Sequence, residues 1–218
     1  MKISKRLKKC ADYVLPNSIV ADVGTDHALL PIYLIENNIA SKVIASDVCK
    51  GPLKMALKNI KQNNLEDKIE IILSDGIEHL NNIVDTLIIS GMGGKLIATI
   101  LNHENINKFK RLILQPNVAS NILRIHLQEI GFRIIYEEMI YEKESYYEIL
   151  VCEKGEMNLS EREIFFGPII INNKTKNFIN HYQSELNKYE NIIKNVPFDD
   201  ENYYKLKRRI SLINNELK

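Results

Sequence analysis

The chain has 218 residues, of which 45% are hydrophobic and 26% are charged, and its formal net charge is +1. This composition belongs to a globular protein with room for one α/β domain and a smaller second domain, and it excludes a disordered or fibrous chain. The three cysteines form no C-x-x-C pair and the five histidines show no ligand spacing, so we expect reduced thiols and no metal site.

The longest run without Asp, Glu, Lys or Arg extends from Leu112 to Leu123, and it is too short to span a bilayer. The first residues are basic and amphipathic, without the apolar core of an export signal. We therefore expect a cytoplasmic protein without a membrane partner. The sequence does not define the oligomeric state, for which a monomer is the favoured interpretation.

Charge is divided unevenly along the chain. Residues 1–20 hold five basic side chains and one acidic one, residues 21–156 hold 14 and 19, and residues 157–218 hold ten and eight. Basic ends around an acidic central part suit a polyanion that is held at the periphery. The alternative interpretation is that these charges only solubilise helix faces.

Apolar positions in residues 3–14 repeat at helical spacing, and Pro16 ends this predicted amphipathic helix. Five strands then alternate with four helices, the strands at 18–23, 42–47, 68–73, 84–89 and 109–114 and the helices near 28–38, 51–64, 94–104 and 118–129. Such alternation predicts an α/β fold, with a parallel sheet covered by helices on both faces. Two further strands, 131–141 and 145–152, predict a final antiparallel hairpin.

Two apolar stripes follow in residues 178–196 and 203–217, with intervals of three and four. They consist of Ile179, Tyr182, Leu186, Tyr189, Ile193 and Val196, and of Tyr203, Leu206, Ile210, Ile213 and Leu217. These intervals predict a coiled-coil hairpin, because Pro197 to Asp200 supplies a helix stop and an N-cap between the stripes. We therefore divide the chain into a domain of residues 1–156 and a helical coiled-coil domain of residues 157–218.

The segment from Val20 to Ala28 leaves the first predicted strand and enters a helix. Gly24 allows the backbone to turn tightly beside a ligand, and the following helix presents free N–H groups to it. Asp22, Asp47 and Asp75 end three successive strands, at the edge where such sheets bind ligands. Each of these acids taken alone could merely cap a helix. A dinucleotide-binding motif would need its second glycine where Asp26 stands.

Several motifs resemble those of the bacterial tRNA (adenine-N1)-methyltransferases that modify adenosine 22. They are D-V-G-T-D-H-A-L-L-P from position 22, S-K-R-L-K-K from 4, S-G-M-G-G from 90, L-Q-P-N from 114, Y-Y-E from 146 and an F-G-P turn from 166. The resemblance covers essentially the whole chain. It implies a Rossmann-like class I methyltransferase fold, S-adenosylmethionine as the cofactor and tRNA as the partner. The basic residues Lys5, Arg6, Lys8, Lys9, Lys205, Lys207, Arg208 and Arg209 are then the candidate RNA contacts.

The three strand-end acids fit the three parts of this cofactor. We expect Asp22 to hold the methionine amino group, Asp47 the ribose hydroxyls and Asp75 the adenine amine. The other predicted cofactor contacts are Gly24, Val48, Gly76, Gly91, Met92 and Gly93.

The strand that ends at Ser90 lacks the N/D-P-P-Y/F clamp with which exocyclic-amine methyltransferases hold their substrate, so a ring nitrogen fits better as the methylated atom. Methylation of adenine N1 leaves a cation until a proton leaves N6, and a carboxylate can stabilise that charge or accept that proton. Asp26 is the predicted catalytic group and His27 the second candidate, although His27 could instead cap or pack a helix. Tyr146 or Tyr147 could stack on a flipped base or belong to the core.

Two alternative functions are open at this point. One is a class I methyltransferase acting on another RNA site or on a small molecule, and of these two substrates the basic ends disfavour only the small molecule. The other is a non-catalytic, cofactor-binding RNA-interaction protein, which the four acids of the predicted site disfavour.

Overall fold

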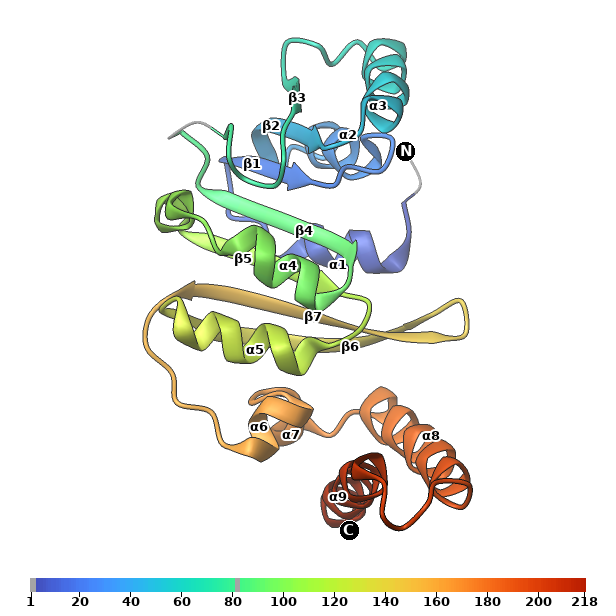
Figure 1. Ribbon diagram of the computed structural model, residues 1–218. Coiled ribbons are helices and arrows are strands. Elements are labelled where there is room, and N and C mark those ends of the chain that lie inside the picture. The colour runs from blue at the N-terminus through green and yellow to red at the C-terminus, as the bar shows by residue number, and fades with distance from the viewer. Residues whose placement is uncertain (1–2, 81–82) are drawn as a thin grey trace. The chain divides into compact units, whose positions relative to one another are not determined.

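The computed structural model describes residues 3–80 and 83–218. The chain forms two compact units, Met1–Ile169 and Ile170–Lys218. Within the described residues, the first unit contains a seven-stranded sheet with the order β3-β2-β1-β4-β5-β7-β6 (Figure 1). Its strands are β1 (Ser18–Val23), β2 (Ala40–Asp47), β3 (Ile69–Leu73), β4 (Thr86–Met92), β5 (Arg111–Pro116), β6 (Phe132–Glu142) and β7 (Ser145–Lys154).

The first five strands are parallel, and β7 pairs antiparallel with both β5 and β6. The predicted parallel sheet with a final antiparallel hairpin is therefore confirmed. The helices of this unit are α1 (Lys5–Asp12), α2 (Leu29–Glu36), α3 (Lys50–Gln62), α4 (Gly94–Leu101), α5 (Ser120–Glu129) and α6 (Glu161–Phe166), with a 3-10 helix η1 (Glu104–Lys108). The helix predicted for 94–104 ends at Leu101, and η1 begins separately at Glu104.

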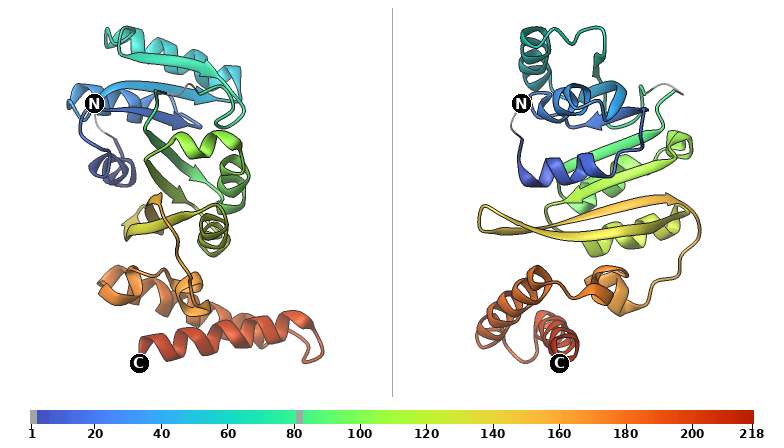
Figure 2. Two further views of the ribbon diagram at one scale, coloured as in Figure 1. Left: turned by 90° about the vertical axis from the view of Figure 1, so that its left-hand side faces the viewer. Right: turned by 180° about the vertical axis from the view of Figure 1, so that it is seen from behind.

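Alternate residues of the central strands enter two separate hydrophobic cores. Leu87 and Ile89 of β4 pack with residues of α4 and α5, whereas Ile88 packs with residues of α1, α2 and α3. Figure 2 shows α1 on the face of the sheet opposite α4 and α5. Side chains of a strand point alternately to its two faces, so burial on both faces explains why these strands are apolar throughout.

The β6–β7 hairpin is longer than the strand beside it. Its pairing with β5 reaches Leu150 opposite Leu114, whereas the pairing of β6 with β7 continues to Glu142 opposite Ser145. The tip of the hairpin therefore projects past the carboxyl end of β5, towards the edge of the sheet where the predicted site residues lie.

A buried ionic network joins the hairpin to the segment that follows it. The Arg124 guanidinium of α5 lies 2.9 Å from the Glu137 carboxylate of β6, contacts Glu148 of β7 and donates to the Ile164 carbonyl at 3.2 Å. The Ile169 N–H donates to the other Glu137 oxygen at 3.0 Å. These bonds hold residues 160–169 to the rest of the first unit. The boundary between the two compact units accordingly lies after Ile169, later than the expected boundary at residue 156.

The second unit contains α7 (Ile170–Asn173), α8 (Lys176–Ile193) and α9 (Glu201–Leu217), and α8 packs against α9. Asp200 caps α9 by accepting from the Asn202 N–H at 2.8 Å. The predicted apolar stripe of α8 is wrong at Ile179, which is 46% exposed. The neighbouring Phe178 is buried in its place and contacts the Tyr182 ring. The two helices are thus present, and their coiled-coil supercoiling stays a prediction.

Candidate functional site

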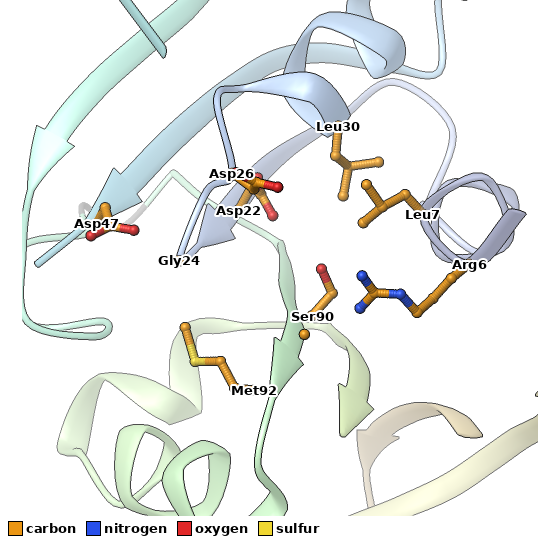
Figure 3. A pocket seen from close by; sticks show the side chains of 10 residues that line it. Arg6, Leu7, Asp22, Gly24, Asp26, Leu30, Asp47, Ser90 and Met92 are labelled. Atoms are coloured by element: carbon orange, nitrogen blue, oxygen red, sulfur yellow. The ribbon is translucent and has the colours of Figure 1, made fainter. Parts of the chain in front are cut away.

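A cavity of about 320 Å³ lies at the carboxyl ends of β1, β2 and β4 (Figure 3). It has acidic, basic and apolar walls. Its lining residues are Arg6, Leu7, Asp22, Gly24, Asp26, Leu30, Asp47, Ser90, Gly91 and Met92. Six of the predicted cofactor and catalytic residues therefore meet in one place, namely Asp22, Gly24, Asp26, Asp47, Gly91 and Met92.

The turn after β1 is held to its neighbouring strand. The N–H groups of Gly24 and Thr25 both donate to the Ser46 carbonyl of β2, at 2.9 and 3.0 Å. Gly24 has a φ of +75°, and a Cβ at this position would overlap the Met92 methyl group. A glycine is favoured here because L side chains rarely adopt this conformation, whereas the Met92 methyl group ends a flexible side chain that could shift.

Two consecutive residues after this turn also have left-handed backbones. His27 and Ala28 both have a φ of 56°, and the Asn59 side-chain amide donates to the His27 carbonyl at 2.9 Å. Non-glycine residues in this region carry strain that the surrounding structure must hold. The strained turn places the exposed Asp26 carboxylate beside Asp22 at the cavity.

Asp22 is the buried acid of the site, with 4% of its surface exposed. Burial, together with smaller contributions from the negative charges of Asp26 and Asp47, raises the pKa of Asp22 to about 6. A positively charged ligand group in the cavity would therefore stabilise the ionised form of Asp22, which burial disfavours.

The other two strand-end acids occupy different positions. Asp47 lines the cavity, and its Oδ1 accepts from the Cys49 N–H at 2.7 Å, which fixes the orientation of the carboxylate. Asp75 is exposed and is not among the lining residues, and neither are Gly76 and the 63%-exposed Val48. The structure therefore brings Asp22 and Asp47 together but leaves Asp75 outside this cavity.

The loop after β4 is held by side chains from the end of β5. The Gly91 N–H donates to the Gln115 Oε1 at 3.0 Å, and the Asn117 side-chain amide donates to the Gly91 carbonyl at 2.7 Å. Gly91 has a φ of +82° and lines the cavity, whereas Gly93 is the N-cap residue of α4 outside the lining. No role was predicted for Gln115, whose fully buried side chain braces this loop.

Arg6 lies in the cavity wall, although its sequence context placed it among the RNA contacts. Its guanidinium donates to the Gln115 Oε1 and lies 5.2 Å from the centre of the Tyr147 ring. Leu7 and Leu30 complete the apolar part of the wall and were not predicted. The sequence of α1 shows a polar helix face, and nothing in it indicates that Arg6 points into a cavity.

The remaining catalytic and stacking candidates lie around the cavity. The Nε2 atom of His27 is 3.3 Å from the Asp26 Oδ1, and both side chains are exposed. His27 itself does not line the cavity. The Tyr147 ring faces Arg6, and the Tyr146 ring packs against Tyr141 with centroids 4.8 Å apart.

The other basic candidates differ in their exposure and in their neighbours. Lys5, Lys8, Lys207 and Arg208 are exposed. Lys9 lies 3.1 Å from Glu138, Lys205 lies 2.6 Å from Glu201, and the Arg209 guanidinium lies 5.7 Å from the centre of the Tyr189 ring.

The described part of the chain has neither a membrane-spanning helix nor a cluster of metal-ligating side chains. No helix there has the length and hydropathy needed to cross a membrane. No group of three or more His, Cys, Asp or Glu residues there could hold a metal ion.

Comparison with known proteins identifies the family. The model of the tRNA (adenine(22)-N(1))-methyltransferase family matches residues 20–216. The chain belongs to this family. The Bacillus subtilis tRNA (adenine(22)-N(1))-methyltransferase is 32% identical over 205 residues, which cover 90% of this chain and 86% of that protein.

Solved structures of similar proteins share the fold over the whole chain. A protein of the NADB-Rossmann superfamily from Streptococcus agalactiae has a TM-score of 0.97 at 38% identity, covering 100% of this chain and 98% of that one. TrmK of M. capricolum, in complex with S-adenosyl-homocysteine, has a TM-score of 0.90 at 31% identity and covers 100% and 98%. The predictions of the family, of the class I methyltransferase fold and of S-adenosylmethionine as the cofactor are confirmed.

Proposed function

We propose that this chain transfers the methyl group of S-adenosylmethionine to N1 of adenosine 22 in tRNA. The observation that carries this proposal is the cavity in which Asp22, Asp47 and the exposed Asp26 meet, in a chain that a tRNA (adenine(22)-N(1))-methyltransferase model matches over residues 20–216. A decayed, non-catalytic relative would have no need of the strained turn that presents Asp26.

The residues of the cavity fit the cofactor. S-adenosylmethionine supplies an electrophilic methyl group on a positively charged sulfur, and three carboxylates line the cavity that would receive it. The buried Asp22 suits the methionine ammonium group, and Asp47 at the end of β2 suits the ribose hydroxyls. The left-handed turn at Gly24 lets backbone approach the ligand. Contacts from Val48, Asp75, Gly76 and Gly93 stay predictions.

We infer that Asp26 handles the proton released by the reaction. Adenine N1 has a lone pair that can attack the methyl group directly, so holding the base in position supplies much of the rate. The methylated base then carries a positive charge until a proton leaves its N6 amine. The Asp26 carboxylate at the cavity stabilises this charge and accepts this proton, and His27, 3.3 Å away, can pass the proton to solvent.

Replacement of Asp26 by Asn tests this role. We expect Asp26→Asn to bind cofactor and tRNA as the native chain does, while its single-turnover rate at saturating cofactor and tRNA falls by about 10²–10⁴-fold. The matched control is Asp67→Asn, which removes an exposed carboxylate elsewhere in the same unit. A rate reduced by less than about tenfold would show that Asp26 is not the essential carboxylate.

The methylated position is tested by product mapping. Purified chain, labelled S-adenosylmethionine and an unmodified tRNA transcript should give 1-methyladenosine at position 22, and a transcript with guanosine at this position should accept no label. Labelling at another nucleotide would favour the alternative methyltransferase function.

The basic residues of the second unit support a tRNA-binding role for its helical hairpin. Lys205, Lys207, Arg208 and Arg209 lie within α9 and are exposed, and phosphate contacts need such cations. Lys5 and Lys8 of α1 are exposed in the same way. The finer assignments proposed with this function are a monomeric state and a cytoplasmic location.

A further inference from the structure

We propose that Asn59 of α3 is a positioning residue for methyl transfer, which holds the His27 carbonyl and so fixes the turn that carries the Asp26 carboxylate. The Asn59 Nδ2 donates to the His27 carbonyl oxygen at 2.9 Å, across 32 residues of chain. Asn59 itself is not among the residues that line the cavity. The proposal rests on the role that the proposed function gives to Asp26.

The turn from Asp26 to Ala28 holds a conformation that its residues do not favour. Both His27 and Ala28 have a φ of 56°, and Ala28 is the N-cap residue of α2 without a side-chain cap bond. Ala gains nothing in return for a left-handed backbone, because it has no side chain that can hydrogen-bond nearby backbone groups. Contacts from other elements must therefore hold this turn.

The two ends of the turn are held by backbone bonds. The Thr25 N–H donates to a carbonyl of β2 at 3.0 Å, and the Leu29 N–H donates to the Asp26 carbonyl at 3.1 Å. Between these bonds lies the His27 carbonyl, which accepts from the side chain of another element. Asn59 thus acts on the peptide unit that follows the residue next to Asp26.

The helix α3 gives Asn59 a fixed position. Ala56 and Ile60 of this helix are buried in the same hydrophobic core as Ala28 of the turn. Asn59 precedes Ile60 and reaches from the rim of this core to the His27 carbonyl. This hydrogen bond is exposed to solvent, and water could satisfy the carbonyl in its place. The contribution of Asn59 is therefore the direction that it imposes on the peptide unit.

The direction of this peptide unit determines where Asp26 and His27 point. The His27 Nε2 lies 3.3 Å from the Asp26 Oδ1, and Figure 3 shows Asp26 beside Asp22 in the cavity. If the His27 carbonyl rotated away from Asn59, the backbone that carries both side chains would shift with it. A misplacement of about 1 Å can cost about 10²-fold in rate. Loss of the Asn59 bond should therefore slow methyl transfer without weakening cofactor binding.

Replacement of Asn59 by Ala removes the donor and keeps a good helix former in α3. We expect the single-turnover rate of Asn59→Ala at saturating cofactor and tRNA to fall by about 10- to 100-fold. Its calorimetric affinities for S-adenosylhomocysteine and for tRNA should match those of the native chain. The matched control is Asn63→Ala, which removes another side-chain amide bond at 2.8 Å, donated to the Asn59 carbonyl within α3. This control should keep the native rate.

A double-mutant cycle with Asp26→Asn distinguishes positioning from a general structural effect. If Asn59 acts through the Asp26 carboxylate, adding Asn59→Ala to Asp26→Asn should change the remaining rate by less than about twofold. A loss of the same factor in both backgrounds would overturn the proposal, because Asn59 would then act on the site without Asp26. A native rate for the single variant Asn59→Ala would overturn it as well.

The conformation of the turn is measured without turnover. In amide NMR spectra of the full chain, Asn59→Ala should shift the signals of residues 24–29, whereas Asn63→Ala should leave them in place. Unchanged signals in Asn59→Ala would contradict the proposal. A slow Asp26→Asn beside a native Asn59→Ala would overturn this proposal alone. A native rate for Asp26→Asn would instead overturn the proton-accepting role in the proposed function, and this proposal with it.

Discussion

Asp22 couples the protonation of the site to the stability of the fold. Burial raises its pKa from 3.8 to about 6, so between these values the folded chain holds a proton that the unfolded chain has lost. The contribution of Asp22 to the free energy of unfolding therefore decreases as the pH rises through this window. A bound ammonium group reverses this effect, because it stabilises the ionised carboxylate that folding alone disfavours.

This coupling predicts a pH dependence of cofactor binding. Between pH 5 and 7 the affinity of the native chain for S-adenosylhomocysteine should rise as Asp22 ionises near pH 6. Asp22→Asn should bind more weakly at pH 7 and show a flatter profile. Calorimetry at half-unit pH steps measures both curves, and parallel curves for the two chains would exclude Asp22 as the titrating group.

At the scale of elements, the network around Arg124 explains two of the sequence motifs together. Glu148 belongs to Y-Y-E and Gly167 to F-G-P, and both meet the Arg124 guanidinium. A Cβ on residue 167 would lie 2.6 Å from a Glu137 oxygen and 2.7 Å from the Arg124 Nη2. The motif glycine is therefore required by the closeness of a buried ion pair and by its φ of +98°.

Gly167→Ala should destabilise the first unit strongly. The new methyl group displaces the partners of a buried charge pair, and the loss should approach the roughly 3–5 kcal/mol that removal of one partner costs. Gly131→Ala is the matched control, because Gly131 also has a left-handed backbone, with a φ of +73°, but has no atom within 4 Å of the added Cβ. The control should lose only about 1–2 kcal/mol from backbone strain. Denaturant unfolding measures both, and equal losses would show that the ion pair tolerates the methyl group.

The strands were predictable from sequence because burial on both faces makes them apolar throughout, as in β4 and β5. The short α6 and α7 were not, because neither is long enough to show a helical period. The position of Arg6 in the cavity wall was not predictable for a different reason. The spacing of apolar residues shows which face of α1 packs, but it does not show that a cavity opens beside the polar face. Asp75 was predicted to end its strand as Asp47 does, but β3 ends at Leu73, and Asp75 lies in the exposed segment beyond it.

At the scale of the whole molecule, the second unit is expected to serve RNA rather than the cofactor. The cavity is lined entirely by residues of the first unit. The exposed cations of α9 suit phosphates, whose contacts carry no base information. The competing interpretation is that the hairpin only covers apolar surface.

Neutralising Lys205, Lys207, Arg208 and Arg209 should weaken the binding of different tRNAs by similar factors. If all four contact phosphates, the slope of log affinity against log salt should flatten by about 3–4 units. A control that neutralises the exposed Lys54, Lys58, Lys61 and Lys68 of the first unit removes the same charge. If the plots of log affinity against log salt coincide for the native chain and the α9 variant, the hairpin does not contact phosphates and serves only in packing.

The Glu142 carboxylate of the β6–β7 hairpin caps α1 by accepting from the Lys5 N–H, and this contact sets the order in which the site can form during synthesis. Lys5 and Glu142 are 137 residues apart, so the ribosome must add the whole parallel part of the sheet before the carboxylate that holds α1 emerges. Contacts this distant along a chain close late, because a long loop must be ordered first. The helix that carries Arg6 is thus synthesised early, but its Glu142 cap can form only after the β6–β7 hairpin has been made.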